Sequence, residues 1–551
     1  MPEKYALGMD FGTQSGRAVL VRLQDGEEVA VSVCSYQHGV MDRFLPSGKA
    51  LPSNFALQHP MDYLQVLEYN ISEILRMAAV PVHQVVAVGI ATTSSTIMPV
   101  FEDGTPLCFA AEFADDPHSW VKLWKHHGAH QEASELDEFL QTTAPILAKQ
   151  FGASSSERML PKILEVKRRS PQIYERAFTF VELSDWLIWQ LTGTLQRSAP
   201  VAGYKAMWQA KKGYLDLESL KSISSDYADI IHRKLPGPVI GLGYAGNILP
   251  HMAEKFGLHP ETAVATGHID AHAALLGCGV TQPGTLVMVM GTSTCHLLLD
   301  EKLELVEGMS GAVQNGIIGG FYAYESGQSS VGDQFHWFVT QSVPSGYEET
   351  AKQQNLNVYE YLEKLARELS LGRTGLLALD WWNGNRSVLN DSTLSGLLIG
   401  LTAQTKPEEI YLALLESTAF GARRIVESFE EAGLGVEKLC ACGGLPRRNE
   451  LLVQVYANVM KRPIEVAQSD YTSALGMAMW AGVAAGSKRG GYDNIEHAVK
   501  AMAPRAGTTY CPDPQVSDVY DLLYEEYKTL YDYFGRGGNG VMRLLGALAG
   551  G

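Results

Sequence analysis

The pattern of apolar and polar positions divides the chain into short strands and longer helices that alternate along most of its length. The first apolar stretch, Tyr5 to Leu23, is interrupted by a Gly, Thr and Ser turn and therefore predicts a β-hairpin. A second hairpin with a Gly-Thr turn is predicted at 285–300. Because the two hairpins lie about half a chain apart, the pattern indicates an internal duplication.

The segments around the hairpins predict an α/β fold in which helices cover a sheet. Strands are predicted at 85–91, 438–441 and 463–467, and helices at 60–79, 119–130, 156–169, 182–191, 325–341, 359–368, 407–432, 449–460 and 516–533. The Gly-rich segment 535–540 is predicted to be a mobile tail. The pattern is interrupted between Gly279 and Gly284, which divides the chain into domains 1–279 and 280–551.

Composition changes this picture mainly by excluding classes of protein. A chain of 551 residues is too long for one hydrophobic core, so two large domains are expected. A net charge of −17 disfavours a nucleic-acid partner, whose recognition requires clustered Lys and Arg. The chain has neither a signal-peptide pattern nor 18 unbroken apolar residues, and its seven cysteines contain no C-x-x-C pair. We therefore expect a cytoplasmic protein with reduced thiols and no membrane partner.

Asp270 is the most informative single residue. An apolar run that starts at Ala263 stops at Gly267, and Asp270 then precedes a run of small, helix-forming residues. A carboxylate placed just past a strand end and at a helix start can act as a base. His268 and His272 flank it at helical spacing, so a zinc-dependent hydrolase is the competing hypothesis.

The zinc hypothesis lacks a third protein ligand. The other histidine cluster lies at 118–130, on the predicted helix that we expect to be exposed to solvent, and comprises His118, His126, His127 and His130. Solvated histidines are the more common explanation for such a cluster.

The two hairpin turns, Gly12-Thr13-Gln14 and Gly291-Thr292-Ser293, could present N–H and hydroxyl groups to a polyphosphate. Asp10, at the end of the first strand, suits a Mg²⁺ ion. No P-loop sequence occurs, and a G-x-G-x-x-G match at 241–246 is followed by Pro250 where a dinucleotide-binding helix would be under way. Lys205 and Glu325 lie among small and aromatic residues, which favours a role in holding a polar ligand.

These segments together resemble the FGGY carbohydrate kinases. The resemblance covers nearly the whole chain and is most specific at Gly396–Leu401 followed by Glu409–Glu416, which is similar to the C-terminal motif of the family. Segments 123–127, 202–208, 290–295 and 325–329 resemble the members that act on ribulose.

The resemblance implies a two-domain actin-like ATPase fold, related to ribonuclease H, with a cleft between the domains. It implies ATP and Mg²⁺ as cofactors and phosphorylation of a ketopentose, first L-ribulose to L-ribulose 5-phosphate in L-arabinose catabolism. Asp270 would be the catalytic base, and the cation would lie at Asp10. Sugar-binding residues would be Trp124, Lys125, Lys205, Glu325 and Thr92. Nucleotide contacts would come from the two turns and from Gln328, Gly443, Gly444 and Asn449.

Two positions depart from the family pattern. Ala91 stands where the ribulose-specific members usually carry an Asp, and Arg158 stands where they tend to have an aromatic residue. A kinase for another pentulose or a pentitol is therefore the nearest alternative. A chaperone-like or filament-forming actin-like ATPase without a sugar substrate is a third hypothesis, and a homodimer is compatible with the sequence.

Overall fold

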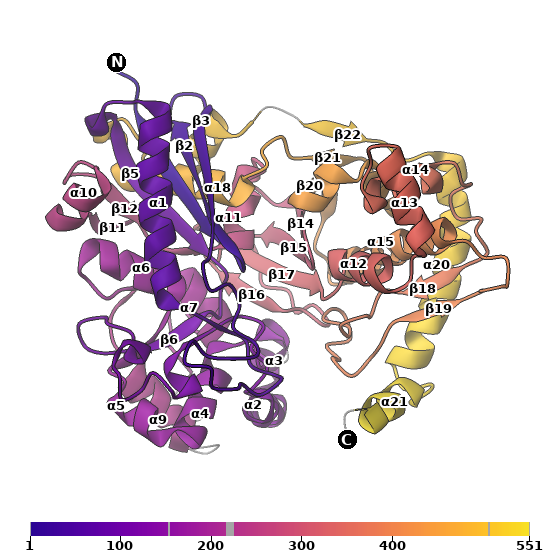
Figure 1. The fold of residues 1–551 in the computed structure, drawn as a ribbon, viewed down its shortest axis with the longest axis horizontal. Coiled ribbons are helices and arrows are strands. Elements are labelled where there is room, and N and C mark those ends of the chain that lie inside the picture. The colour runs from indigo at the N-terminus through magenta and orange to yellow at the C-terminus, as the bar shows by residue number, and fades with distance from the viewer. Residues whose placement is uncertain (1, 153–154, 216–224, 505–506, 550–551) are drawn as a thin grey trace. The chain divides into compact units, whose positions relative to one another are not determined.

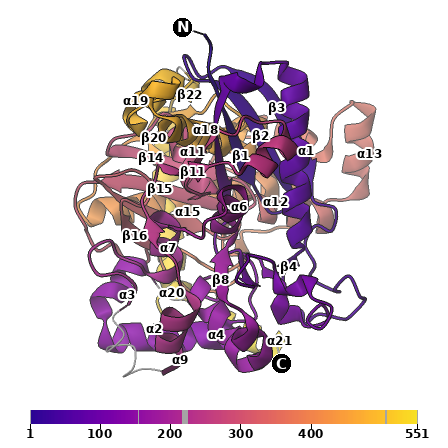
Figure 2. The same cartoon turned by 90° about the vertical axis from the view of Figure 1, so that its left-hand side faces the viewer.

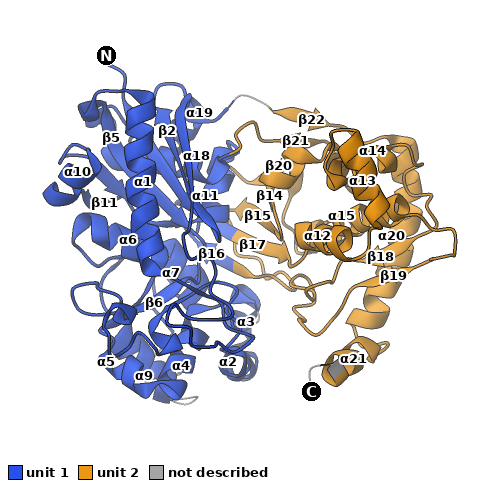
Figure 3. Ribbon diagram, in the orientation of Figure 1, with its two compact units in different colours: residues 1–281, 312–323, 471–504 blue, residues 282–311, 324–470, 505–551 orange. Residues whose placement is uncertain are grey.

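The computed structural model describes the whole chain except residues 1, 153–154, 216–224, 505–506 and 550–551. The chain forms two compact units, and each contains segments that are distant in sequence (Figure 3). Unit 1 comprises residues 1–281, 312–323 and 471–504, and unit 2 comprises residues 282–311, 324–470 and 505–551. The expected division at 279/280 lies close to the first unit boundary, but 312–323 and 471–504, which that division assigns to the second domain, pack with unit 1.

The main sheet of unit 1 has strand order β11-β12-β5-β1-β2-β3, and β13 also pairs with β5. These strands are β1 (Tyr5–Phe11), β2 (Ser15–Arg22), β3 (Glu28–Ser35), β5 (Val85–Thr92), β11 (Tyr244–Asn247), β12 (Ala263–Ala265) and β13 (His268–Ile269). β1 and β2 form the predicted antiparallel hairpin, whereas β12 and β13 run parallel to β5, as does β1. The carboxyl ends of β1, β5 and β13 therefore meet at one edge of the sheet.

Helices cover both faces of this sheet (Figure 1). On one face α1 (Pro60–Ala78) packs against β2 and β3, where Val66, Leu67 and Ile71 join a core with residues of β1. On the other face α18 (Thr472–Ala485) packs against β1, β5 and α11 (Asp270–Gly277). Figure 2 turns the molecule so that β1 and β2 lie between α1 and α18. α18 is buried almost all round, in keeping with its apolar sequence.

Unit 1 also contains a smaller sheet with order β4-β7-β6-β8, and the predicted site residues Trp124 and Lys125 follow its strand β7. Its strands are β4 (Leu57–Gln58), β6 (Ile97–Val100), β7 (Val121–Lys122) and β8 (Thr179–Glu182), and β9 (Arg197–Ser198) pairs with β10 (Val239–Ile240). The remaining α-helices in the described part of unit 1 are α2 (His130–Thr143), α3 (Pro145–Phe151), α4 (Met159–Arg169), α5 (Pro171–Arg176), α6 (Leu183–Thr192), α7 (Ala199–Ala206), α9 (Ser225–Lys234), α10 (Pro250–Phe256) and α19 (Ile495–Met502).

The sheet of unit 2 repeats the pairing pattern of unit 1. β14 (Gly284–Met290) pairs antiparallel with β15 (Thr294–Asp300) and parallel with β20 (Val436–Cys442), just as β1 pairs with β2 and β5. The strand order continues from β17 (Tyr322–Gln328) through β15, β14 and β20 to β21 (Ile464–Val466) and β22 (Thr508–Tyr510). This shared topology supports the internal duplication that the two hairpins predict.

The other elements of unit 2 are mainly helical. They are α12 (Gly332–Gln341), α13 (Ser345–Gln353), α14 (Val358–Arg367), α15 (Pro407–Glu431), α16 (Gly444–Arg448), α17 (Glu450–Met460), α20 (Pro514–Gly535), α21 (Val541–Ala549) and the pair β18 (Leu377–Leu379) and β19 (Leu397–Ile399). β16 (Gly311–Gln314) begins the segment 312–323 that belongs to unit 1.

Three predicted segments differ from the structure. The helix predicted at 119–130 is absent, because Val121–Lys122 instead forms β7 between β4 and β6 and α2 begins only at His130. The first residues of the helix predicted at 325–341 form strand β17, and the helix starts at Gly332. The predicted tail at 535–540 is held in place, since Asn539 N–H donates to the Tyr533 carbonyl at 2.7 Å and α21 follows.

Candidate active site

Three predicted site residues occupy neighbouring strand ends in unit 1. In the parallel register Asp10 lies opposite Ala91 and Ala91 opposite His268, so Phe11, Thr92 and Ile269 form the next row. Asp270 follows directly as the first residue of α11. The structure thus brings Asp10 and Asp270 to one sheet edge, two strands apart.

The side chain of Asp10 is buried and only partly neutralised. Its Oδ2 accepts a hydrogen bond from Arg17 Nη1 at 3.0 Å, whereas its Oδ1 has no hydrogen-bond partner among the described residues. Burial raises the pKa of Asp10, and the neighbouring Arg17 guanidinium lowers it in part. A buried carboxylate oxygen without a donor is a suitable ligand for a hard cation.

Asp270 is half-buried, and its Oδ1 accepts a hydrogen bond from the Ala271 N–H at 2.7 Å. Tyr36 lies near both carboxylates: burial raises its pKa well above the usual value, and Asp10 and Asp270 each raise it further. Asp270 therefore combines a held carboxylate with partial access, as a base requires.

The turn of the first hairpin is fixed through its carbonyl groups. Tyr36 donates from its hydroxyl to the Gly12 carbonyl at 2.9 Å and from its N–H to the Gln14 carbonyl at 3.0 Å, and Gln58 Nε2 donates to the Thr13 carbonyl at 2.8 Å. No hydrogen bond from the Thr13 or Gln14 N–H to the described part of the chain is found. The turn is thus arranged to offer donors, which suits a phosphate.

Trp124 joins this turn to the smaller sheet. Its indole Nε1 donates to Thr13 Oγ1 at 3.0 Å, and its ring is half-buried. Lys125 follows it and is also half-buried, while Lys205 lies in the last turn of α7 with its Nζ 5.9 Å from the centre of the Tyr204 ring. Thr92 is buried and donates only to the adjacent Thr93 carbonyl at 3.2 Å, so its hydroxyl serves the local backbone.

In unit 2, the turn Gly291–Ser293 is also fixed through its carbonyls. The Thr292 carbonyl accepts from the Val331 N–H at 2.8 Å and from the Asp333 N–H at 3.2 Å, at the start of α12. Glu325 and Gln328 lie on β17 and are buried. Gln328 Nε2 donates to Asp380 Oδ2 at 2.7 Å and to the Thr418 carbonyl at 2.8 Å, which leaves only its buried Oε1 without a partner among the described residues.

The remaining predicted nucleotide residues of unit 2 lie where β20 meets α16 and α17. Gly443 has a φ of +97°, and a Cβ there would overlap the Met290 carbonyl, so only glycine fits. Gly444 has open space around it. Asn449 caps α17 by accepting from the Leu452 N–H at 2.8 Å and donates to the Tyr411 hydroxyl at 2.9 Å, so its side chain is engaged by the fold.

The histidines next to Asp270 belong to the core. His268 and His272 are both buried, and the His272 ring packs edge-on against Tyr204 with ring centres 4.4 Å apart. Burial and, to a smaller extent, the neighbouring His272 lower the pKa of His268 to about 3, which keeps its ring neutral. These contacts favour packing over metal binding.

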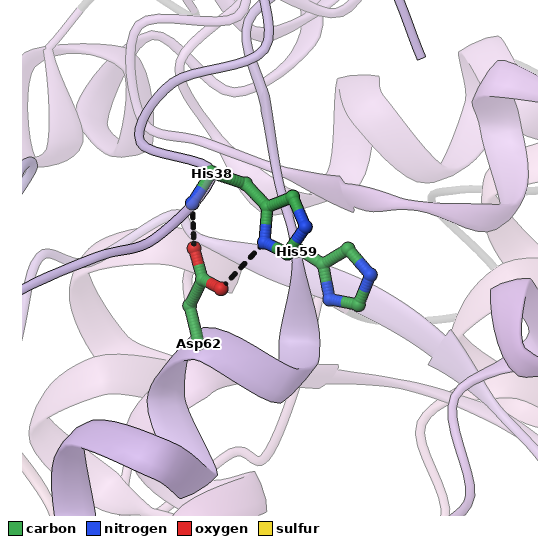
Figure 4. Close-up of side chains that lie close together, drawn as sticks. All are labelled: His38, His59 and Asp62. Atoms are coloured by element: carbon green, nitrogen blue, oxygen red, sulfur yellow. Dashed lines mark hydrogen bonds and ion pairs between the residues drawn. The ribbon is translucent and has the colours of Figure 1, made fainter. Parts of the chain in front are cut away.

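Across the residues that the structure describes, one set of three potential metal ligands has all its donor atoms within 4.8 Å of one another, and it is His38, His59 and Asp62 (Figure 4). The zinc hypothesis at His268, Asp270 and His272 is thus not supported by the geometry. Asp62 Oδ2 accepts from the His38 N–H at 2.9 Å, and Asp62 Oδ1 lies 2.7 Å from His38 Nδ1.

The two rings of this set are stacked, with centres 4.2 Å apart and only 15° between their planes. A metal ion must lie close to the plane of each imidazole that binds it, and two nearly parallel planes do not meet within bonding distance. His59 instead caps α1, since its Nδ1 accepts from the Met61 N–H at 3.2 Å. The set therefore anchors the start of α1.

Two of the four residues in the second histidine cluster are buried, contrary to the expectation that the whole cluster is exposed. His118 and His126 are buried, and His126 Nε2 lies 2.9 Å from Glu165 Oε2, which also faces Lys122 Nζ at 3.0 Å. Only His127 and His130 are exposed. The expectation failed because the segment pairs as a strand and turns inward, where the Glu165 carboxylate compensates the buried Lys122.

Sequence reasoning missed two buried charged residues close to the predicted sugar residues, Lys162 and Glu182. Lys162 could have been found, because it interrupts the apolar stripe Met159, Ile163 and Val166 of α4 at helical spacing. Glu182 is the last residue of β8 and precedes a helix. The local sequence gives only a weak indication that a residue at this position is buried.

The fold and the two hairpin turns define a class of carbohydrate kinase with an actin-like ATPase fold. Residues 5–277 match the N-terminal domain of the FGGY family of carbohydrate kinases, and residues 286–485 match its C-terminal domain. The chain belongs to this family, whose members phosphorylate sugars with ATP.

Relatives named ribulokinase match the full length of the chain. The protein of Halalkalibacterium halodurans is 48% identical over 551 residues, covering 100% of this chain and 98% of that protein. The protein of Staphylococcus aureus (strain Newman) is 39% identical over 99% of both chains. Among solved structures, xylulose kinase from Rhodospirillum rubrum has a TM-score of 0.76 at 20% identity over 96% of this chain and 98% of that one, which shows the shared fold.

No helix within the described residues is long and apolar enough to cross a membrane.

Proposed function

We propose that the protein transfers the γ-phosphoryl group of ATP to the terminal hydroxyl of L-ribulose, giving L-ribulose 5-phosphate for L-arabinose catabolism. The observation that carries the proposal is the placement of Asp10 and Asp270 at one edge of the sheet, two strands apart, in a chain 48% identical from end to end to a ribulokinase. The Asp10 carboxylate is suited to binding a cation, and the Asp270 carboxylate is suited to accepting a proton.

In this reaction Asp270 accepts the proton of the terminal sugar hydroxyl. The hydroxyl oxygen then bonds to the γ-phosphorus, and the bond between that phosphorus and the bridging oxygen of the β-phosphate breaks, so that ADP leaves. The N–H of Ala271 holds the Asp270 carboxylate at the start of α11. Trp124, Lys125 and Lys205, all of unit 1, are the proposed sugar contacts.

Asp10 fits a Mg²⁺ ion, since its buried Oδ1 has no donor among the described residues. Burial raises the pKa of Asp10, and the Arg17 guanidinium offsets part of that rise. When bound, the ion would neutralise charge on the phosphoryl oxygens. The N–H groups of Thr13 and Gln14, and the equivalent turn at Gly291–Ser293, are proposed phosphate donors; Gly444, with open space around it, is the proposed point of close approach to the nucleotide.

We infer a cytoplasmic location, because none of the seven cysteines, all of which lie in described segments, forms a disulfide.

The proposed function is tested by measuring ADP release with a panel of pentuloses, pentitols and hexuloses. We expect L-ribulose to give the highest kcat/KM among them. A higher kcat/KM for another pentulose or a pentitol would point to the effect of Ala91, which is buried between Asp10 and His268. ADP release that no sugar stimulates would contradict the kinase function.

Replacing Asp270 with Asn is expected to reduce kcat by several orders of magnitude, because the amide cannot accept the proton and general-base catalysis with the associated positioning is lost. The exposed Asp42→Asn is the matched control and should retain wild-type turnover. Circular dichroism and thermal melting establish that both variants fold. Near-normal turnover of Asp270→Asn would show that another group is the base.

A further inference from the structure

We propose that Lys162 is a positioning residue for the sugar, holding Trp124 and the loop after β5 in place through their backbone carbonyls. Lys162 lies on α4 and its side chain is fully buried. Its Nζ donates to the Ser95 carbonyl at 2.6 Å and the Leu123 carbonyl at 2.7 Å, and lies 3.5 Å from the Trp124 carbonyl. The proposal deepens the proposed function and rests on it.

The carbonyls that Lys162 binds come from two separate segments. Ser95 lies between β5 and β6, three residues after Thr92, and has a left-handed backbone with a φ of +57°. Leu123 and Trp124 directly follow β7. A left-handed conformation at a serine persists only where the surroundings hold it, and the ammonium is the donor that its carbonyl meets.

A further contact extends this arrangement to the phosphate turn. Trp124 donates from its indole to Thr13 Oγ1 at 3.0 Å, so one residue connects the Lys162 contacts to the turn between β1 and β2. Lys162 itself is fully buried and is not placed to bind the sugar directly. Its effect on the sugar must therefore be transmitted through Trp124 and the segment that follows Thr92.

The surroundings of Lys162 favour a role in binding backbone carbonyls over a role as one half of a structural ion pair. The pKa of Lys162 is lowered to about 7, chiefly by burial, with Lys122 lowering it as well and Glu182, Glu157 and Glu165 opposing the change. No carboxylate forms an ion pair with its Nζ among the described residues, in contrast to Lys122, which lies 3.0 Å from Glu165. The N–H groups of Lys162 are therefore directed at carbonyl groups. Glu182 is also influenced by Lys205, a proposed sugar contact.

The test compares Lys162→Met with Lys167→Met. Methionine has a similar length but no donor, so it should leave the three carbonyls without their shared partner. Lys167 is on the same helix but forms ion pairs with Asp226 and Asp229, at 2.9 and 2.7 Å, which makes it a matched control. We expect Lys162→Met to raise the KM for the sugar at least tenfold and to change the KM for ATP less than twofold, with Lys167→Met unchanged in both.

A double-mutant cycle with Trp124→Phe tests whether Lys162 affects sugar binding through Trp124. If Lys162 acts through Trp124, the effects of the two substitutions on the KM for the sugar should be clearly less than multiplicative. An unchanged sugar KM in Lys162→Met, an equal rise in both KM values, or fully multiplicative effects would overturn the proposal.

If Lys162→Met does not fold, Lys162→Gln, which retains a shorter donor, replaces it. Failure of both variants to fold would assign Lys162 a purely structural role. The comparison uses whichever sugar the wild-type protein phosphorylates. An error in the proposed substrate would therefore show in the wild-type panel and leave the variant comparison intact.

Discussion

Single buried side chains determine how this protein should respond to acid. His296 on β15 is fully buried, and neither of its ring nitrogens has a hydrogen-bond partner among the described residues. Burial alone lowers its pKa to about 3. An unfolded histidine titrates near 6.5, so between these values the unfolded chain holds a proton that the folded chain lacks. The free energy of unfolding therefore falls as the pH drops below about 6.5.

Replacing His296 with Leu should reduce the slope with which the free energy of unfolding falls at acid pH, by up to about 1.4 kcal/mol per pH unit. At pH 7 the variant should be as stable as the wild type or more stable, because leucine has no buried polar atom to satisfy. Urea denaturation at pH 7, 6 and 5 measures both effects, with the exposed His130→Gln as the control. An unchanged pH slope in His296→Leu would contradict the prediction.

At the same scale, the sequence identified residues by their type and surroundings but not by their burial. Asp10, Asp270 and the two Gly-Thr turns could be predicted because strand ends and turns have local signatures. Lys162 and the His118–His126 pair could not be placed, because their contacts come from segments that local patterns do not connect. Lys162, for example, meets a carbonyl 67 residues away in the sequence.

At the scale of elements, α18 is held by contacts between backbones. A Cβ at Gly8 of β1 would overlap the Ala474 carbonyl of α18, and a Cβ at Gly476 would overlap the Ala273 carbonyl of α11. Glycine at these points permits the helix to lie directly on its neighbours. A hydrophobic pattern does not encode such a close approach, and α18 was not predicted from the sequence.

Replacing Gly8 with Ala should lower the free energy of unfolding by about 3 kcal/mol, because the added methyl group forces α18 away from β1. The control is Gly241→Ala, also in unit 1, where an added Cβ meets no atom within 4 Å. Chemical denaturation of both variants measures the difference. Equal stabilities would show that α18 can shift without cost.

The element predictions that failed share a cause. The segment 119–130 has helix-forming residues, yet β7 forms within it because β4 and β6 supply strand partners from distant parts of the chain. In the same way, Glu325 and Gln328 belong to a strand of the sheet in unit 2. Long helices such as α15, in contrast, match their predicted ranges within a residue or two, since their periodicity is local.

At the scale of the whole molecule, unit 1 is assembled from distant parts of the chain. Residues 1–281 form most of it, but α18 and α19 come from 471–504. A fragment of residues 1–281 would leave apolar faces of β1, β5 and α11 uncovered. We expect this fragment alone to be insoluble or to show no cooperative melting, and co-expression with residues 471–504 joined to a soluble carrier to improve its yield. A fragment that melts cooperatively by itself would contradict this.

The origin of α18 also affects how the protein is made. On the ribosome, the first hairpin emerges early, but the helix that covers its sheet is not complete until residue 485 of 551 has been added. During most of synthesis, the nascent chain therefore carries an exposed apolar sheet face, and a chaperone that covers this face until α18 has been made would protect it from aggregation. A premature stop codon anywhere before α18 would consequently yield no partly functional sugar-binding half.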